Sequence, residues 1–276
     1  MPTLTTDIPT SLRLALDKEI ARSGGDESAV ITEALAAHLG TRVHTLFQVS
    51  TSGALIAGVS TGAVSVKTIL DHGDFGLGTF ADLDGEMVVL DGRVYWVQGS
   101  GCVSKAPLEA RAPFAVVTRF APQVDVEVGP LATLAALQVR CDSFRSSGNL
   151  FYAVRLDGQF DRIRTRAVNP SPTTARLIDA AKSQTEFNFS NIDGTLVGLW
   201  SPGFSGAFSI PGYHFHFISD DCEHGGHLLD CAAKRLQLRM EALTDFHLSL
   251  PETENFLKAD LSKNRAEELA YAEQAH

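Results

Sequence analysis

Three histidines late in the chain are the residues whose types and spacing point most directly to chemistry. His214 and His216 alternate with aromatic residues, and in a β-strand alternate side chains share one face. We therefore expect the two imidazoles to lie side by side, with the aromatic rings packed on the opposite face. His227 follows Gly225-Gly226, whose permissive backbone would let the strand turn back and bring in a third nitrogen. Three imidazoles with open coordination positions predict a catalytic metal site for Zn²⁺ or another divalent metal.

Two neighbouring residues compete with His227 as the third ligand. Cys222 and His224 lie in the same segment. A thiolate would make the site softer and more closed, which fits a structural role better than a catalytic one, so His227 is the preferred ligand. Four further histidines stand alone in the sequence and are interpreted as ordinary surface or core residues: His38, His44, His72 and His247.

Charge and cysteine content limit the classes of partner and the cell compartment. The 276 residues include 23 basic and 33 acidic ones, for a net charge of −10, which repels polyanions and argues against nucleic acid as the main partner. The start of the chain lacks the pattern of an export signal, and no stretch of about 18 apolar residues offers a membrane span, so we expect no membrane association. Cys102, Cys141, Cys222 and Cys231 show no C-x-x-C spacing. Reduced thiols and a cytoplasmic location are therefore expected.

Residues 1–40 differ in pattern from the rest of the chain. Leu12, Leu16 and Ile20 recur at helical spacing, Gly24-Gly25 breaks the pattern, and apolar residues resume it from Ile31, which predicts two short helices. The segment resembles a ribbon-helix-helix module, a family that dimerises and often binds DNA. Its own acidic charge argues against DNA binding. We interpret it as a helical arm that packs on the body or pairs two subunits.

From about residue 45 the pattern is that of strands and tight turns. Residues 87–90 and 94–97 are apolar and flank Asp91-Gly92-Arg93, which predicts a hairpin. Further strands are predicted at residues 114–120, 124–128, 151–156, 196–200 and 213–218, and helices at residues 174–182 and 259–274. The body is thus expected to be mainly β with peripheral helices.

Five stretches together resemble the acetolactate decarboxylase family. They are LFQVST at 46–51, GDFGLGTF at 73–80, LDGEM at 83–87, RTR at 164–166 and the histidine segment, and the likeness runs from about residue 45 to the end. It implies an α+β, mainly β, dimer-forming protein: a two-lobed body of mixed and antiparallel sheets with peripheral helices. The likeness does not cover the N-terminal two-helix arm, which is expected from the helical pattern alone. The corresponding domains are residues 1–40, a β-rich lobe at 41–145 and a β-rich metal-binding lobe at 146–276.

The same resemblance implies a reaction and a set of site residues. The reaction is decarboxylation of 2-acetolactate to acetoin and CO₂, in which the metal chelates the substrate and stabilises an enediolate that is then protonated; no organic cofactor is required. The implied roles are metal ligation by His214, His216 and His227, active-site roles for Glu86, Arg166 and Glu273, and pocket positions for Thr79 and Leu83. Arg166 would hold the substrate carboxylate or the enediolate, Glu86 would deliver the proton, and Glu273 would bind the metal or a water on it.

Two other classes of function remain open from the residues alone. A zinc-dependent hydrolase would explain the three histidines equally well, but it leaves residues 73–80 and Arg166 without a role. A non-enzymatic metal or small-molecule sensor is the other alternative, prompted by the ribbon-helix-helix-like start of the chain.

Overall fold

The chain forms two compact units, residues 1–43 and 44–276. The computed structural model describes residues 4–24, 26–39, 44–170, 184–262 and 268–269. The first unit contains α1 (Thr10–Ser23) and α2 (Glu27–His38), so the two predicted helices are confirmed. Gly24 ends α1 with a φ of 70°, the left-handed conformation that glycine adopts at helix C-termini. The interpretation of this unit as an arm that packs on the body or pairs two subunits stays a prediction.

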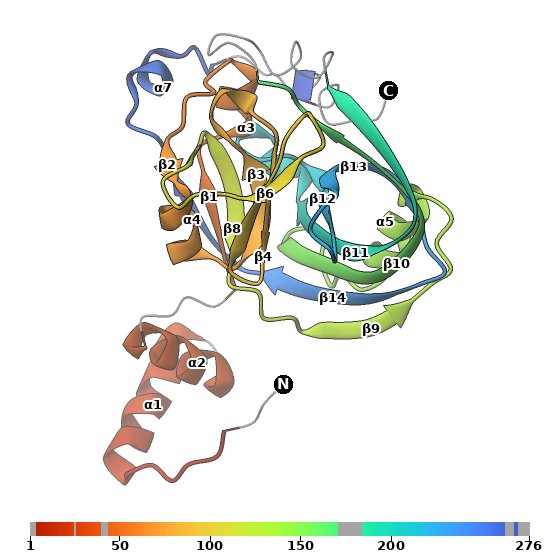
Figure 1. Ribbon diagram of the computed structural model, residues 1–276. Helices are drawn as coiled ribbons and strands as arrows, with labels where there is room; N and C mark the ends of the chain where they lie inside the picture. The colour runs from red at the N-terminus through yellow and green to blue at the C-terminus, as the bar shows by residue number, and fades with distance from the viewer. Residues whose placement is uncertain (1–3, 25, 40–43, 171–183, 263–267, 270–276) are drawn as a thin grey trace. The chain divides into compact units, whose positions relative to one another are not determined.

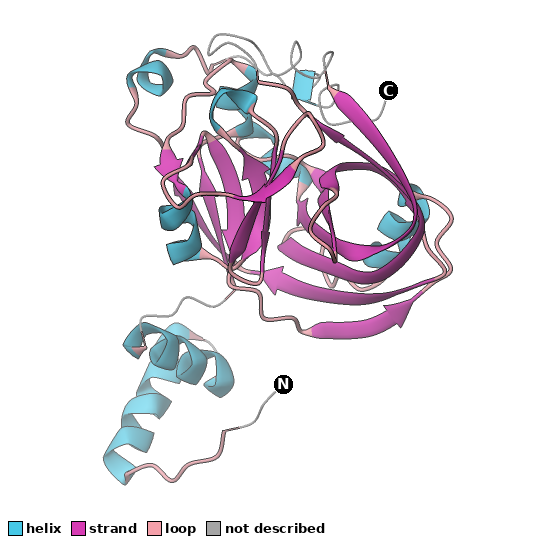
Figure 2. Ribbon diagram, viewed as in Figure 1, coloured by secondary structure: helices cyan, strands magenta, loops and turns pink. Residues whose placement is uncertain are grey.

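The second unit consists mainly of strands, and its described residues form two large sheets and one small one (Figures 1 and 2). In spatial order the seven-stranded sheet contains β15 (Asp245–Ser249), β1 (Thr45–Val49), β8 (Phe114–Thr118), β3 (Phe75–Thr79), β4 (Glu86–Leu90), β5 (Arg93–Val97) and β6 (Val103–Lys105). The six-stranded sheet contains β11 (Thr185–Ser201), β12 (Gly212–Ser219), β13 (Gly225–Ala232), β10 (Phe151–Ala167), β14 (Arg235–Leu243) and β9 (Val124–Val128). The small sheet pairs β2 (Val64–Ser65) with β7 (Arg111–Ala112).

Short helices lie around these sheets. They are α3 (Ser52–Ile56), α4 (Val66–His72), α5 (Leu134–Asp142) and α7 (Glu254–Lys258), with 3₁₀ turns at Ala81–Leu83 and Gly203–Ala207. Each of the four α-helices begins after a Ser or Thr whose hydroxyl accepts a backbone N–H of the first turn, which stabilises helix N-termini. The predicted α+β, mainly β fold with peripheral helices is confirmed. None of the helices in the described part of the chain has the length and hydrophobicity that a membrane crossing requires.

The order of the strands along the chain does not follow the division into two large sheets. The strand β9 precedes residue 145 but lies in the six-stranded sheet, whereas β15 comes late in the chain and pairs in parallel with β1 of the seven-stranded sheet. The chain therefore crosses between the sheets more than once. The domain boundaries expected at residues 40 and 145 stay predictions.

The long strands β10 and β11 hold the hairpin of β12 and β13 in place. They pair with each other in antiparallel fashion from Tyr152↔Trp200 to Ala167↔Thr185. The strand β11 also pairs with β12, β12 pairs with β13, and β13 pairs with β10. These four strands thus close into a ring, and Figure 1 shows β10 and β11 curving together around β12 and β13. A closed ring leaves β12 and β13 little freedom to shift register.

Buried apolar side chains fill the space between the large sheets and on the other face of each. The cluster between the sheets includes Leu77 and Val88 from one side and Val197 and Leu199 from the other. A second cluster, which includes Phe217 of β12, packs the six-stranded sheet against α5. A third covers the face of the seven-stranded sheet that α4 lies against. The sheets are therefore fixed face to face, and residues of both can meet between them.

The predicted strands are confirmed, with differences in length. The hairpin forms between β4 and β5, and its turn residues Asp91 and Gly92 have φ values of 51° and 72°, as expected of a tight two-residue hairpin turn. The strands β10 and β11 extend far beyond the predicted residues 151–156 and 196–200. Charged and polar residues alternate along these extensions because one face of each strand is exposed.

The helix predicted at residues 174–182 lies outside the described residues. Of the helix predicted at residues 259–274, residues 259–262 are not helical. The helix α7 instead lies before them. Residues 268 and 269 are helical, and Leu269 is 4% exposed within the cluster between the sheets.

Candidate metal centre

The strand β12 presents His214 and His216 on one face, as the alternation predicts. In register they stand opposite Leu199 and Val197 of β11, both of which belong to the cluster between the two large sheets. The aromatic residues between the histidines point the other way, and Phe215 and Phe217 are buried in the cluster beneath α5. The two imidazoles therefore face the seven-stranded sheet.

His227 joins them from the neighbouring strand β13. It stands directly opposite His216 in the antiparallel pair, so the two side chains share a face. The turn between the strands is not made by Gly225 and Gly226, which already belong to β13. Gly226 has a φ of 131°, and a Cβ there would meet the carbonyl oxygen of Arg166 at 2.5 Å. The glycine thus allows β13 to approach β10 closely, rather than turning the chain.

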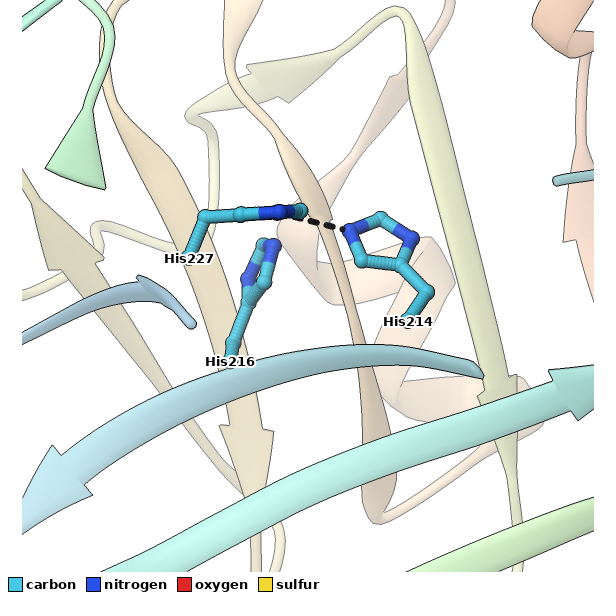
Figure 3. Close-up of side chains that lie close together, drawn as sticks. All are labelled: His214, His216 and His227. Atoms are coloured by element: carbon cyan, nitrogen blue, oxygen red, sulfur yellow. Dashed lines mark hydrogen bonds between the residues drawn. The ribbon is translucent and has the colours of Figure 1, made fainter. Parts of the chain in front are cut away.

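The three imidazoles converge, as Figure 3 shows. Their ring centroids are 4.9–5.4 Å apart, and each ring contributes a nitrogen that lies within 4.8 Å of the other two. His214 Nε2 is 3.1 Å from His227 Nδ1, and two nitrogen ligands of one tetrahedral zinc ion are separated by about 3.3 Å. His216 and His227 are 1% and 5% exposed, and His214 is half-buried. The spacing is therefore already that of a shared ion.

The protonation of these rings suits metal binding. Burial lowers the pKa of His214 to about 3, and the positive charge of Arg166 lowers it further. The pKa of His216 is also lowered well below its usual value, first by burial and then by the proximity of His214. Both rings are consequently neutral near pH 7, and only a neutral imidazole has a lone pair to offer a metal.

One backbone contact selects which nitrogen of His216 faces the other rings. Its Nδ1 donates to the carbonyl oxygen of Met87, 2.8 Å away on β4, so its lone pair lies on Nε2. That Nε2 atom is buried and makes no hydrogen bond within the described part of the chain. A carbonyl that receives the second N–H of a histidine is a usual feature of metal ligation. The three residues therefore fit a divalent metal ion.

Glu86 reaches the centre from the opposite sheet. It begins β4, is 7% exposed, and its Oε2 lies 3.5 Å from His216 Nε2. Thr79 stands opposite it on β3 and donates its hydroxyl to the carbonyl oxygen of Gly85 at 2.8 Å. Leu83 is 1% exposed in the cluster between the sheets. The pocket role predicted for Thr79 and Leu83 stays a prediction.

Arg166 lies beside the histidines on β10. It pairs in register with His227 on one side and with Glu186 on the other, so Glu186, Arg166, His227 and His216 form one row across four strands. A β-bulge at Leu229 separates this row from the regular pairing further along β13, and bulges commonly re-aim side chains beside functional sites. Arg166 is 5% exposed, and its Nη1 donates to Gln184 Oε1 at 2.6 Å.

The back of β12 is tied to α5. The hydroxyl of Tyr213 donates to Asp142 at 2.8 Å and accepts from Arg145 Nε at 3.2 Å. The Arg145 guanidinium also lies 3.7 Å above the ring of Trp200, a cation–π contact. These contacts fix the start of the strand that presents His214 and His216.

The other candidate ligands lie elsewhere. Glu273 lies outside the described residues, and its role stays a prediction. His224 is in the turn between β12 and β13, where it forms with Asp221 and Glu223 a second group of potential ligands. Cys222 in the same turn has a φ of 60°. Sequence reasoning missed the carbonyl of Met87 and the side chain of Gln184, because neither a backbone oxygen nor a single glutamine leaves a recognisable pattern.

By its fold and its site the body belongs to the class of β-rich proteins that can hold a metal ion on three histidines. The model of the alpha-acetolactate decarboxylase family matches residues 46–263. The alpha-acetolactate decarboxylase of Methylococcus capsulatus is 38% identical to this chain over 239 residues, which cover 85% of this chain and 91% of that protein. The protein of the same name from Methanosarcina mazei is 38% identical over 229 residues, which cover 83% of this chain and 80% of that protein.

A solved structure gives the same result. The alpha-acetolactate decarboxylase of Bacillus subtilis strain 168 superposes with a TM-score of 0.81 at 33% identity, over 84% of this chain and 100% of that one. The chain belongs to the alpha-acetolactate decarboxylase family. Residues 1–45 lie outside the matched region.

Proposed function

We propose that this chain catalyses the decarboxylation of 2-acetolactate to acetoin and CO₂ with a divalent metal held by His214, His216 and His227. The observation that carries the proposal is the meeting of three imidazoles, of which His214 and His216 are neutral, with a cation and a carboxylate, Arg166 and Glu86, between two sheets. Membership of the alpha-acetolactate decarboxylase family supports the substrate.

The chemistry explains why such a site is needed. When the bond between the α carbon and the carboxylate breaks, its electron pair passes into the adjacent carbonyl and forms an enediolate. A bound divalent cation supplies Lewis-acid stabilisation of that charge, which is worth several kcal/mol. The protein residues must then hold the carboxylate in position, keep water away, and return one proton to carbon.

Arg166 is suited to hold the substrate anion. A guanidinium offers two parallel N–H donors to a carboxylate. Its register position beside His227 brings that donor fork next to the proposed ligands. Because Arg166 is only 5% exposed, its attraction for an anion is weakly screened by water. Binding in this position fixes the bond that will break relative to the carbonyl that accepts the electrons.

Glu86 is suited to move the proton. It lies on the opposite sheet from Arg166, and its Oε2 is 3.5 Å from His216 Nε2. A carboxyl group there can protonate one face of the enediolate carbon once CO₂ has left. Because the proton comes from one side, the product would have a single configuration.

Several finer points belong to the same proposal. Zn²⁺ is the expected metal because three imidazoles are a frequent catalytic zinc set. Glu273 would bind the metal or a water on it, and Thr79 and Leu83 would line the substrate pocket. We further propose that the chain forms a homodimer. The cytoplasmic location expected from the sequence stays a prediction.

The test is a product assay on purified protein. Metal-free protein should be inactive, and addition of zinc should restore formation of acetoin and CO₂ in equal amounts from 2-acetolactate. An ester or amide substrate should not be hydrolysed at a comparable rate. Metal-loaded protein that hydrolyses such a substrate and leaves 2-acetolactate unchanged would replace this proposal with the hydrolase alternative.

A further inference from the structure

Arg166 has to be held in one orientation before it can present its donors to an anion. An arginine side chain has several rotatable bonds, and ordering a long side chain costs conformational entropy. Arg166 is largely buried and stands next to His227 in register, so a wrong orientation of its guanidinium would direct the donors away from the metal centre. A group that fixes this orientation in advance would reduce the cost of binding.

Gln184 contacts the guanidinium in the way this requires. Its Oε1 accepts from Arg166 Nη1 at 2.6 Å. The backbone beneath it is anchored, because Gln184 immediately precedes β11 and the next residue, Thr185, pairs with Ala167 of β10. The acceptor is therefore placed by the same pair of strands that places Arg166.

The chemical type of the acceptor also matters. An amide oxygen is neutral, so it orients the guanidinium and leaves its positive charge in place. A carboxylate in the same position would cancel that charge and compete with an anionic substrate. Glu186, the carboxylate that stands opposite Arg166 in register, lies 3.5 Å from the guanidinium of Arg164.

We propose that Gln184 is a positioning residue for Arg166: it fixes the Nη1 arm, and with it the orientation of the guanidinium that is proposed to hold the substrate carboxylate. This inference rests on the proposed role of Arg166 in the function stated above. It gives the residue just before β11 a part in substrate binding, without contact to the substrate itself.

The experiment is a double-mutant cycle with Q184M, R166K and the double variant, each with its zinc content and melting temperature measured. Q184M removes the acceptor at nearly constant size, and the loss of a hydrogen bond to a charged group should lower kcat/KM by about tenfold to a hundredfold. In the R166K background the same change should cost about twofold or less, because the positioned group is gone. The matched control is Q159M, at an exposed glutamine on the same strand as Arg166.

A charge variant separates positioning from packing. Q184E keeps size and acceptor but pairs Arg166 with a negative charge, so KM for 2-acetolactate should rise more than kcat falls. Should Q184M fail to fold, Q184N replaces it, because shortening the side chain by one methylene also breaks the contact.

The outcomes distinguish this inference from the function on which it rests. Wild-type kcat/KM in R166K would remove both the role of Arg166 and that of Gln184. An impaired R166K with a wild-type Q184M would overturn the role of Gln184 alone. So would an equal loss from Q184M in both backgrounds, or a wild-type KM in Q184E, since either shows that the residue does not act through the charge of Arg166.

Discussion

The hairpin of β12 and β13 carries two groups of potential metal ligands that differ in almost everything except distance. In both groups the ligand atoms lie within 4.8 Å of one another. The strand group is His214, His216 and His227. The turn group is Asp221, Glu223 and His224, with the two carboxylates exposed. Proximity alone therefore does not separate a metal site from a chance cluster on a surface turn.

What separates them is how the ligand atoms are already engaged. The Asp221 carboxylate accepts from the Ser219 hydroxyl and from the backbone N–H of Glu223, and these hydrogen bonds hold its pKa below the usual range. It stabilises the turn. In the strand group His216 has a buried nitrogen that makes no hydrogen bond within the described residues and faces two further rings. A buried neutral lone pair is already free of water and available to a cation, whereas an exposed carboxylate must first lose its hydration.

The largest expected effect comes from removing one ligand of the strand group. H216A should lose bound zinc and fall to the uncatalysed rate of acetoin formation, because two imidazoles cannot hold the ion in a three-nitrogen site. H224A, the matched change in the turn group, should keep both metal and turnover. Elemental analysis and an acetoin assay on the two proteins make the comparison. Full zinc stoichiometry in H216A would refute the ligand set.

The next effect separates metal binding from chemistry. R166A and E86Q should retain zinc, because neither residue belongs to the three-nitrogen group. Loss of a positioned cation should lower kcat by about a hundredfold or more, and loss of the proton donor should lower it by about a hundredfold to ten-thousandfold. Steady-state kinetics at matched metal content provides the readout. Either variant with wild-type kcat has no place in the mechanism.

Whether the sequence alone could predict a site residue depends on whether that residue is placed by local interactions or by the pairing of distant strands. The shared face of His214 and His216 follows from strand periodicity, and the hairpin at Asp91-Gly92 follows from turn chemistry. These are local rules. The meeting of Arg166 with His227 depends instead on the register of β10 against β13, and on the bulge at Leu229, which no local pattern encodes. Only resemblance to a family could indicate that residue beforehand.

The strands β10 and β11 extend beyond their predicted residues for a related reason. Their central residues alternate because each strand is half buried, yet Asp157, just beyond the predicted residues 151–156, lowers the apparent β propensity. In the fold Asp157 and Arg155 form an ion pair at 2.9 Å, and Arg155 also reaches Asp91 in the turn of the other sheet at 2.7 Å. Tertiary contacts thus sustain a strand that composition disfavours. The carbonyl of Met87 is the opposite case, because a backbone atom has no sequence signature at all.

A smaller effect concerns pH. With the pKa of His214 lowered to about 3 by burial and near 6.5 in an unfolded chain, the unfolded state binds the proton more tightly. The contribution of His214 to the free energy of unfolding is therefore fully present above about pH 6.5 and is lost as the pH falls toward about 3. Between about pH 7 and about pH 5 this imidazole accounts for a loss of about 2 kcal/mol, and His216 adds a loss of the same sign.

Urea unfolding of the metal-free protein at a series of pH values tests this expectation. H214Q should show a weaker pH dependence than the wild type, and H224A in the turn should leave the wild-type slope unchanged. A slope that H214Q does not alter would mean that the strand group is hydrated and not buried.

The smallest expected effect comes from removal of residues 1–40. The family match begins at residue 46, and the chain from residue 44 onward forms its own compact unit. Turnover per zinc-loaded chain should therefore stay close to that of the full-length protein. A folded, metal-loaded truncation without activity would show that the N-terminal helices take part in the site.

The measurement that tests the central claim most directly is anomalous scattering at the zinc edge from crystals of the zinc-loaded protein. The account predicts one peak among His214, His216 and His227, at about 2.0–2.1 Å from a nitrogen of each ring, with His216 bound through Nε2. A peak at Asp221, Glu223 and His224 instead, or no peak between the two sheets, would contradict it.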